Sequence, residues 1–414
     1  MSLPPLQPEQ RIKPPGFELR ISLIYGAIFA SLGIHLPYFP LWLEAEGFNA
    51  EQIGVILAAP MFVRVITTPV ISAMADRARD RANILVAVSL ASLALSLGYF
   101  VPASYGVVLA ISVLLAIVWA PQVPLTDSLA LSGVRRFRSS YTAMRIWGSL
   151  AFLLASVVGG AILSVLSALA VPAMISTGLA IACIAAFLAP RLGPPRRPAG
   201  VAGAAVLASS TRLFGLYFML FVAGTGIINA SHGFMFAFVS IYWKGIGLGD
   251  TTIGALWAWA VVAEVVAFLV FNRILGRVSA TTVMMIAGFA AILRWLAYPL
   301  IEPAGLGVFG FFVVQSLHAL STGLLLIGLQ KMISETVPEE RTGAAQGVAF
   351  FAVGFSMAVV TLGSGPLYER LGIDGFYVMA VVAALGLALI AAASLSQRNH
   401  PHKSGVGGDT IEPS

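Results

Sequence analysis

Ionisable side chains interrupt several long apolar stretches of this sequence. Five acids or arginines lie well inside such stretches: Arg64, Asp127, Arg145, Glu264 and Arg294. Three histidines lie in similar surroundings: His35, His232 and His318. A carboxyl group in a medium of low dielectric takes up a proton more readily than in water, and an arginine binds a carboxylate strongly. These residue types therefore predict ion pairing and proton binding within an apolar interior.

The spacing of these residues along the chain predicts which of them lie at the same depth. At ~1.5 Å per helical residue, Asp127 and Arg145 fall at similar depth on two successive antiparallel stretches. We therefore expect them to be partners in an ion pair. Glu264 and His318 share a level near the middle of their stretches, whereas Arg294 lies in the outer half of its own.

The composition indicates that these stretches lie in a membrane. Of the 414 residues, 58% are apolar and 10% are charged, whereas a soluble domain carries about 25% charge. The apolar residues, about 240 in number, supply about a dozen spans of ~20 residues each. This excludes a soluble enzyme, a disordered chain and an outer-membrane barrel with alternating strands. The one cysteine, Cys183, and the lack of zinc-protease, phosphate-loop and nucleophile motifs predict no enzyme, cofactor or metal site.

Twelve apolar stretches are long enough to cross a bilayer. They are 21–43, 52–75, 83–102, 105–131, 141–165, 168–190, 213–243, 252–275, 279–301, 304–334, 342–367 and 373–396. In the segments between them, 19 Lys and Arg fall on one side, and two, Lys244 and Arg370, fall on the other. Because basic residues favour the cytoplasmic side, both termini are expected in the cytoplasm. The net charge of +6 therefore reflects topology, and we expect no nucleic-acid partner.

An internal repeat divides the chain into two halves. The segment at 47–57 (GFNAEQIGVIL) recurs in pattern at 247–257 (GLGDTTIGALW), and we expect Asn49, with Gln52, and Asp250 to cap the helices that follow. The predicted organisation has five parts: a cytoplasmic tail at 1–18, six helices at 19–190, a cytoplasmic loop at 191–212, six helices at 213–397 and a cytoplasmic tail at 398–414. Because six is even, both halves insert with the same orientation, as in transporters built from parallel repeats.

The loop after the second stretch, SAMADRARDRA, resembles the loop signature of the major facilitator superfamily. With the twelve stretches, the central loop and the repeat, the chain is similar to that superfamily over nearly its whole length. The resemblance implies an all-α integral membrane fold, with twelve transmembrane helices in two pseudo-symmetric six-helix bundles. It also implies a cytoplasmic gate at Asp76, Arg77 and Arg81, which match the signature. Three positions depart from the signature: Ser72, Arg79 and Asp80.

Longer segments, including PLTDSLA, RIWGSLAF and VVQSLHAL, resemble the phenylpropionate permeases, a branch of the lactose-permease-like proton symporters. This resemblance implies two groups of site residues: Asp127, Arg145 and Trp147 for substrate, and Glu264, Arg294 and His318 for proton coupling. The acid that such symporters carry three residues after the histidine is replaced by Ser321. The proton carrier would then be Asp127 or Glu264, and the arginine at the depth of Asp127 favours Glu264.

The expected function is secondary active transport of a small organic solute by proton symport and alternating access. The resemblance suggests an aromatic carboxylate such as phenylpropionate. Arg64 suits a substrate carboxylate, an acidic partner or an anchor to the gate, and Asn229 suits a hydrogen bond in the pore. The alternatives are a sugar or nucleoside proton symporter, a drug exporter, and a membrane sensor that no longer transports. The expected partners are the solute, the proton and the lipid of the bacterial inner membrane, with the monomer as the working unit.

Overall fold

A computed structural model describes residues 8–194, 215–274, 277–337 and 341–399. All regular structure in these ranges is helical. The helices are α1 (Phe17–Ala45), α2 (Ala50–Ala75), α3 (Arg81–Ser96), α4 (Tyr105–Trp119), α5 (Gln122–Phe137), α6 (Tyr141–Leu166), α7 (Val171–Phe187), α9 (Leu216–Ala230), α10 (Gly233–Gly245), α11 (Asp250–Ile274), α12 (Ala280–Ala297), α13 (Gly307–Ser316), α14 (Leu324–Thr336), α15 (Thr342–Leu371) and α16 (Gly375–Asn399). Most of the predicted loop at 191–212 and of the tail at 398–414, and the start of the tail at 1–18, lie outside the described residues.

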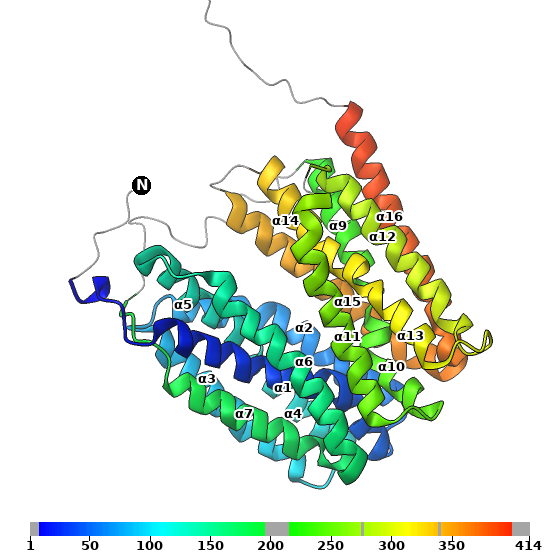
Figure 1. Ribbon diagram of the computed structural model, residues 1–414, viewed down its shortest axis with the longest axis horizontal. Coiled ribbons are helices and arrows are strands. Elements are labelled where there is room, and N and C mark those ends of the chain that lie inside the picture. The colour runs from blue at the N-terminus through cyan, green and yellow to red at the C-terminus, as the bar shows by residue number, and fades with distance from the viewer. Residues whose placement is uncertain (1–7, 195–214, 275–276, 338–340, 400–414) are drawn as a thin grey trace, which may run out of the picture.

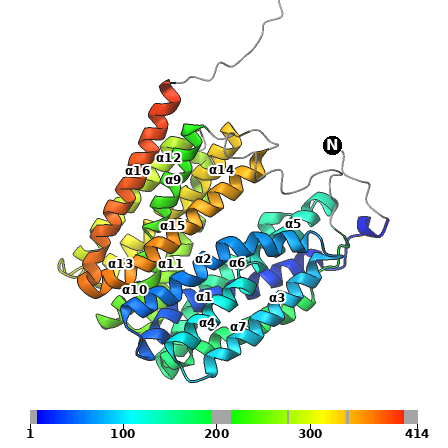
Figure 2. The same ribbon diagram turned by 180° about the vertical axis from the view of Figure 1, so that it is seen from behind.

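The helices form two groups that lie side by side in Figures 1 and 2, α1–α7 and α9–α16. The groups meet where α2 packs on α15, α6 on α11, and α1 on α10. They diverge toward the end of the molecule where α1 begins and α16 ends, which we call the terminal end. The opposite end carries the turns between α1 and α2 and between α10 and α11.

Eleven described segments are long and apolar enough to cross a membrane, by length and composition. Three of them combine consecutive helices: α4 with α5, α9 with α10, and α13 with α14. The last, at 342–396, contains both α15 and α16, which separate at Gly372 where φ is +54°. Large apolar side chains such as Leu154 and Phe309 remain exposed on the outside of the helices, as expected for surfaces that face lipid.

The three combined segments are interrupted near their middles. Between α4 and α5, Pro124 cannot supply the N–H that would bond to the carbonyl of Ala120, so the helix breaks. Between α9 and α10, the side chains of Ser231 and His232 bond to the carbonyl of Ile228 at 2.6 and 3.3 Å and compete with the helical ladder. Between α13 and α14, a π-helix covers Ala319–Gly323, a geometry found often at functional sites.

The internal repeat has a structural explanation. Gly47 and Gly247 adopt φ values of +86° and +88°, which glycine tolerates best, in the turns that close the opposite end. The predicted capping box forms, with Gln52 N bonded to Asn49 Oδ1 at 2.9 Å and Asn49 N bonded to Gln52 Oε1 at 3.1 Å. The predicted cap at Asp250 is wrong, because α11 begins at this residue and its carboxylate pairs with Lys244 Nζ at 2.6 Å.

The capping box provides the first prediction. Asn49→Ala leaves the N–H of Gln52 without its acceptor at the start of α2. We expect the free energy of unfolding to fall by about 1 kcal/mol, the usual effect of an N-cap loss. Thermal unfolding in detergent measures the change, with Glu51→Ala, an exposed neighbour outside the box, as the control. Equal effects of the two substitutions would contradict the capping role.

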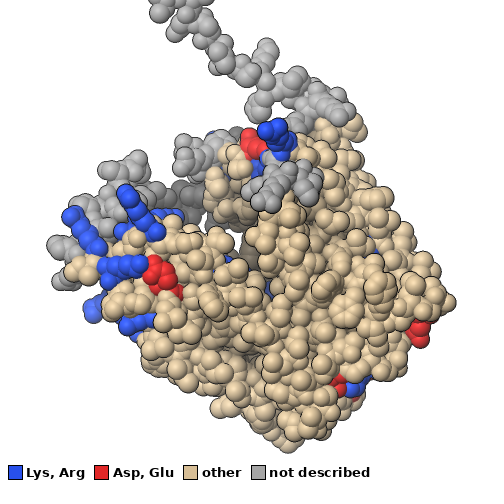
Figure 3. All heavy atoms as spheres, in the orientation of Figure 1, with Lys and Arg blue, Asp and Glu red and all other residues tan. Residues whose placement is uncertain are grey.

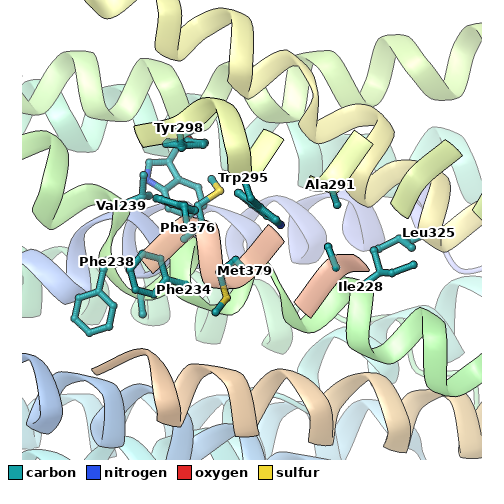
Figure 4. Close-up of a cluster of buried hydrophobic side chains, with 14 of the residues drawn as sticks. Ile228, Phe234, Phe238, Val239, Ala291, Trp295, Tyr298, Leu325, Phe376 and Met379 are labelled. Carbon is teal, nitrogen blue, oxygen red and sulfur yellow. The ribbon is translucent and has the colours of Figure 1, made fainter. Parts of the chain in front are cut away.

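The core of the α9–α16 group is an aromatic cluster, shown in Figure 4. Phe376 of α16 stacks on Trp295 of α12 and on Tyr298, which directly follows α12, with ring centroids 5.3 and 4.4 Å apart. Phe234 of α10 meets Phe376 edge-on at 5.0 Å. Stacked and edge-on pairs add to the stabilisation from apolar burial. The cluster therefore holds α12 firmly between α10 and α16, next to the buried side chain of Arg294.

Candidate functional site

A cavity of about 1360 Å³ lies between the two groups of helices. Its wall comes mainly from α1, α2, α4, α5 and α6 on one side and from α10 and α15 on the other. Figure 3 shows the surface hollowed between the two groups toward the terminal end. The aromatic residues in this wall are Phe29, Phe39, Tyr99, Trp119, Phe152, Phe236, Phe350 and Phe351. The cavity is large enough for a small organic ligand and is mainly apolar, as binding pockets usually are.

At the opposite end the two groups of helices are closed on each other. A Cβ atom at Gly254 of α11 would clash with the carbonyl oxygen of Ser156 on α6. A Cβ at Gly54 of α2 would lie 3.1 Å from the Cα of Gly365 on α15. Glycine is therefore needed for the close approach of both helix pairs. The cavity is sealed at this end and open at the other.

Asp127 lies in the cavity wall on α5, and two tyrosines bind it. The hydroxyls of Tyr25 and Tyr141 donate to its Oδ1 at 2.5 and 2.9 Å. The predicted ion pair with Arg145 does not form here, because no nitrogen of Arg145 lies within 4.0 Å of a carboxylate among the described residues. The guanidinium instead lies over the rings of Phe29 and Tyr25, at 4.0 and 5.4 Å from their centroids. Tyr25 therefore links the two charges that spacing alone would have paired directly.

Arg64 of α2 and His35 of α1 also line the cavity. Neither has a hydrogen-bond or ion-pair partner among the described parts of the chain. Their ring and guanidinium nitrogens are not among the buried unpartnered atoms, so they reach the cavity space. Arg64 is thus a cation in a mainly apolar wall, where an anion would bind strongly.

Arg294 is the centre of a buried polar network on the other side. It is 0% exposed, and within the described ranges no carboxylate lies within 4.0 Å of it. Its Nη1 donates to His318 Nδ1 at 3.0 Å and to Ser321 Oγ at 3.3 Å, while its Nη2 donates to Gln315 Oε1. Tyr298 also donates to Gln315 Oε1, at 2.9 Å. Neutral acceptors therefore solvate this charge.

Glu264 faces this network through His318. Because Arg294 donates to Nδ1 of His318, that nitrogen must accept, and the ring proton lies on Nε2. Nε2 is 3.9 Å from Glu264 Oε2, so a small movement brings them into hydrogen-bond contact. The Glu264 side chain is 26% exposed, against 10% for His318, and is thus the more accessible member of this pair. The three residues that the resemblance assigned to proton coupling thus lie next to each other.

His232 joins the same network, and sequence reasoning gave it no role. Its Nε2 lies 3.1 Å from Ser321 Oγ, and its Nδ1 bonds to the carbonyl of Asn229 at 3.2 Å. Asn229 therefore contributes a backbone oxygen, and its side chain is absent from the lining of the large cavity. No sequence signal indicated this role, because the break between α9 and α10 is seen only in the structure.

The remaining predicted site residues are Trp147 and the residues of the loop signature. Trp147 is 54% exposed and is not part of the cavity wall. In the loop, Arg81 Nη2 pairs with Asp76 Oδ1 at 2.6 Å, and Arg81 Nη1 reaches Ser132 of α5 at 3.3 Å. Arg77 is exposed nearby.

Asp80, which departs from the loop signature, is the buried member of the loop. Its Oδ1 caps α3 through the N–H of Ala82, and its Oδ2 accepts the N–H of Gly193, each at 2.8 Å. This loop is therefore fixed to the segment that follows α7.

In the described ranges, no group of three His, Cys, Asp or Glu side chains could hold a metal ion.

Comparison with known proteins places the chain among transporters. Residues 18–379 match the family described as "MFS_1 like family". A probable 3-phenylpropionic acid transporter of Escherichia coli (strain K12) is 27% identical over 369 residues, 88% of this chain and 94% of that protein. A maltose permease of Geobacillus stearothermophilus is 28% identical over 384 residues, 89% and 93% of the two chains. A crystal structure of a mutant of the nucleoside transporter NupG has the same fold, with a TM-score of 0.79 at 16% identity, covering 92% of this chain and 99% of that chain.

Proposed function

Because the chain belongs to the MFS_1 like family, whose members are membrane transporters rather than enzymes, we propose that it moves a small aromatic carboxylate together with a proton. The observation that carries this proposal is Arg64, a cation without a protein partner among the described residues, in an aromatic cavity. A carboxylate would neutralise Arg64, and an aromatic ring would replace solvent against the apolar wall. The similarity to a 3-phenylpropionic acid transporter supports the same class of substrate.

The proposed topology has twelve spans in two six-helix bundles, with both termini in the cytoplasm of a bacterial cell. The separation of α15 from α16 supports the twelfth span, since these helices have 30 and 25 residues and ~20 suffice. Figure 3 supports the orientation, because Lys and Arg gather at the terminal end on the face shown. The cavity would then open to the cytoplasm in this conformation. It lies within one chain, which supports the monomer as the working unit.

The proposed transport cycle rocks one bundle against the other, with the substrate between them. The contacts of α2 with α15 and of α6 with α11 close the opposite end and would separate when the cavity opens outward. Asp76 and Arg81 belong to the cytoplasmic gate in this scheme, together with Arg77. Their ion pair would help to hold α2, α3 and α5 together as one side moves.

Glu264 is the proposed proton carrier. It is a carboxylate without an arginine or lysine within 4.0 Å among the described residues, and it faces His318 and the Arg294 network. Asp127 receives two tyrosine hydroxyls, which favour its ionised form and make it the weaker candidate. Protonation of Glu264 would also remove one charge from a region of low dielectric, which makes movement of the two bundles easier.

A sugar symporter is the competing function, because the maltose permease is 28% identical to this chain. A sugar needs many hydrogen-bonding groups, since each buried hydroxyl without a partner is unfavourable. Besides Asp127, Arg64 and His35, the cavity wall offers one side-chain amide among the described residues, Gln346, and a few hydroxyls, beside a large aromatic surface. This balance favours an aromatic acid over a sugar or nucleoside.

Uptake into proteoliposomes tests the proposal. We expect the purified full chain to accumulate labelled 3-phenylpropionate when the outside is acidic, and a protonophore should abolish the accumulation. Maltose and uridine, offered under the same gradient, should not accumulate. Gradient-driven uptake of either of these without uptake of the acid would reject the aromatic-acid assignment. Binding of the acid without any uptake would favour the membrane sensor.

A further inference from the structure

Two nitrogen-bearing side chains line the same cavity, and the sequence assigned no joint role to them. His35 lies 10 residues before the end of α1 and Arg64 lies 14 residues after the start of α2, so they are at similar depth in two consecutive helices that run antiparallel. Both face the cavity without a protein partner in the part of the chain that the structure describes. A guanidinium supplies a permanent positive charge and several N–H donors, and a neutral imidazole supplies one N–H donor. The pair therefore has the composition of a site for a single carboxylate.

Aromatic packing, rather than hydrogen bonding, fixes the position of His35. Its ring stacks on Phe39 with centroids 4.5 Å apart and planes 17° apart. Trp119 of α4 meets it edge-on at 5.0 Å. Because the stack on Phe39 uses the face of the imidazole, and its nitrogens bond to no described residue, they remain available to a ligand. A side chain held in this way loses little conformational entropy when it binds.

The wall beside Arg64 also has unmet hydrogen-bonding capacity. Thr68 lies one helical turn from Arg64 on the same face of α2 and lines the cavity. The Oγ1 of Thr68 and the Nε1 of Trp119 are both buried without a hydrogen-bond partner among the described residues. Buried polar atoms are nearly always hydrogen-bonded, so the hydroxyl of Thr68 is a further group beside the cavity that is free to bind a polar ligand. The hydroxyl of Thr68 can meet one after rotation about χ1.

We propose that Arg64 and His35 together bind the carboxylate of the transported solute. Arg64 supplies the charge and His35 supplies one hydrogen bond, while the aromatic wall holds the ring. The proposal rests on the proposed function and refines it, because it places the carboxylate on α1 and α2 rather than at Arg145. Arg145 already has its charge over two aromatic rings and is not part of the cavity wall.

Equilibrium binding to the full chain in lipid nanodiscs tests the proposal, with 3-phenylpropionate and its neutral analogue 3-phenylpropionamide as probes. Wild type should prefer the acid at least about tenfold, the effect of a hydrogen bond to a charged group. Arg64→Gln should remove this preference, and Arg64→Lys should keep most of it. His35→Phe, which retains the ring contacts, should weaken acid binding about tenfold. His35→Gln, which restores an N–H donor, should bind within about threefold of wild type.

Arg79→Gln removes an exposed arginine outside the cavity and should leave both probes unaffected. Size-exclusion profiles check that each variant is folded, and Arg64→Met, which also removes the charge, serves if Arg64→Gln is not. Unchanged acid binding in His35→Phe, or an acid preference that survives in Arg64→Gln, would overturn the subsite but leave the transport function standing. Failure of the wild type to bind any aromatic acid, with binding of maltose or uridine, would instead overturn the proposed function.

Discussion

Glu264→Gln should exchange external for internal 3-phenylpropionate across a membrane, yet accumulate none against a gradient. The amide of glutamine has the shape of a protonated carboxyl group but cannot release a proton. If Glu264 is the carrier, the variant resembles the permanently loaded state, in which the two bundles can still move with substrate bound. Net symport requires the carrier to unload, so this step alone should fail. The expected loss of accumulation is complete, which makes it a large effect.

The environment of Glu264 is the reason for this expectation. Its Oε2 lies 3.9 Å from Nε2 of His318, and the other ring nitrogen of His318 accepts from the buried Arg294. An ionised Glu264 can accept the Nε2–H of His318 and attracts the positive charge of Arg294, whereas protonation weakens both interactions. The protonation state therefore changes the interactions between α11, α12 and the π-helix segment.

Two assays in proteoliposomes separate the steps. Accumulation is measured with an acidic outside, and exchange is measured with equal substrate on both sides and no gradient. Glu335→Gln is the matched control, because Glu335 is an exposed glutamate that pairs with Lys331 at 3.1 Å on the surface. The control should behave as wild type in both assays. If Glu264→Gln still accumulates substrate in response to the proton gradient, Asp127 becomes the carrier, and Asp127→Asn should then show the selective loss.

The sequence predicted the fold best where the signal is local. The capping box of Asn49 and Gln52 formed as expected, because a helix start depends on the few residues around it. The recurring glycines also had a direct cause, since Gly47 and Gly247 occupy turns with positive φ. Apolar length located the helices, although three segments proved to be broken in their middles.

The candidate site was harder to predict, because the neighbours of a side chain depend both on its depth along the helix axis and on its direction around that axis. Spacing placed Asp127 and Arg145 at one level, but the rotation of each helix decides which neighbours a side chain meets. Tyr25 took the place between them, and in a sequence of apolar stretches a tyrosine looks like any other aromatic residue. Trp147 shows the same limit, since it lies on an exposed face of α6.

The buried network shows a further limit. Ser321 looked like the loss of a proton-carrying acid, yet its hydroxyl links Arg294 to His232 across two helices. The position can therefore keep its place in the hydrogen-bond network although a serine stands where the related symporters carry an acid. The π-helix places Ser321 in this position, and no pattern in the sequence announces that geometry.

Gly254→Leu should hold the opposite end open and abolish uptake. Gly254 lies where α11 crosses α6, and even a Cβ there would clash with the carbonyl oxygen of Ser156 and the hydroxyl oxygen of Tyr38. A leucine cannot fit without separation of the two helices. Overpacking of this kind costs about 1–3 kcal/mol. A shift of that size changes the equilibrium between the two conformations by roughly 5- to 150-fold.

Spin labels across the opposite end measure the effect directly. Glu46→Cys and Arg370→Cys, both at exposed positions, are introduced together in a Cys183→Ala background. The label-to-label distance should lengthen in Gly254→Leu, and uptake should fall at least about fivefold. Gly363→Leu is the matched control, because it makes the same change in α15 where a Cβ meets nothing within 4 Å. Since the substrate site would still be reachable from that end, 3-phenylpropionate should still bind. A short label distance with intact uptake would mean that leucine fits between α6 and α11 without separating them. A long label distance with intact uptake would mean that these helices do not need to close for transport.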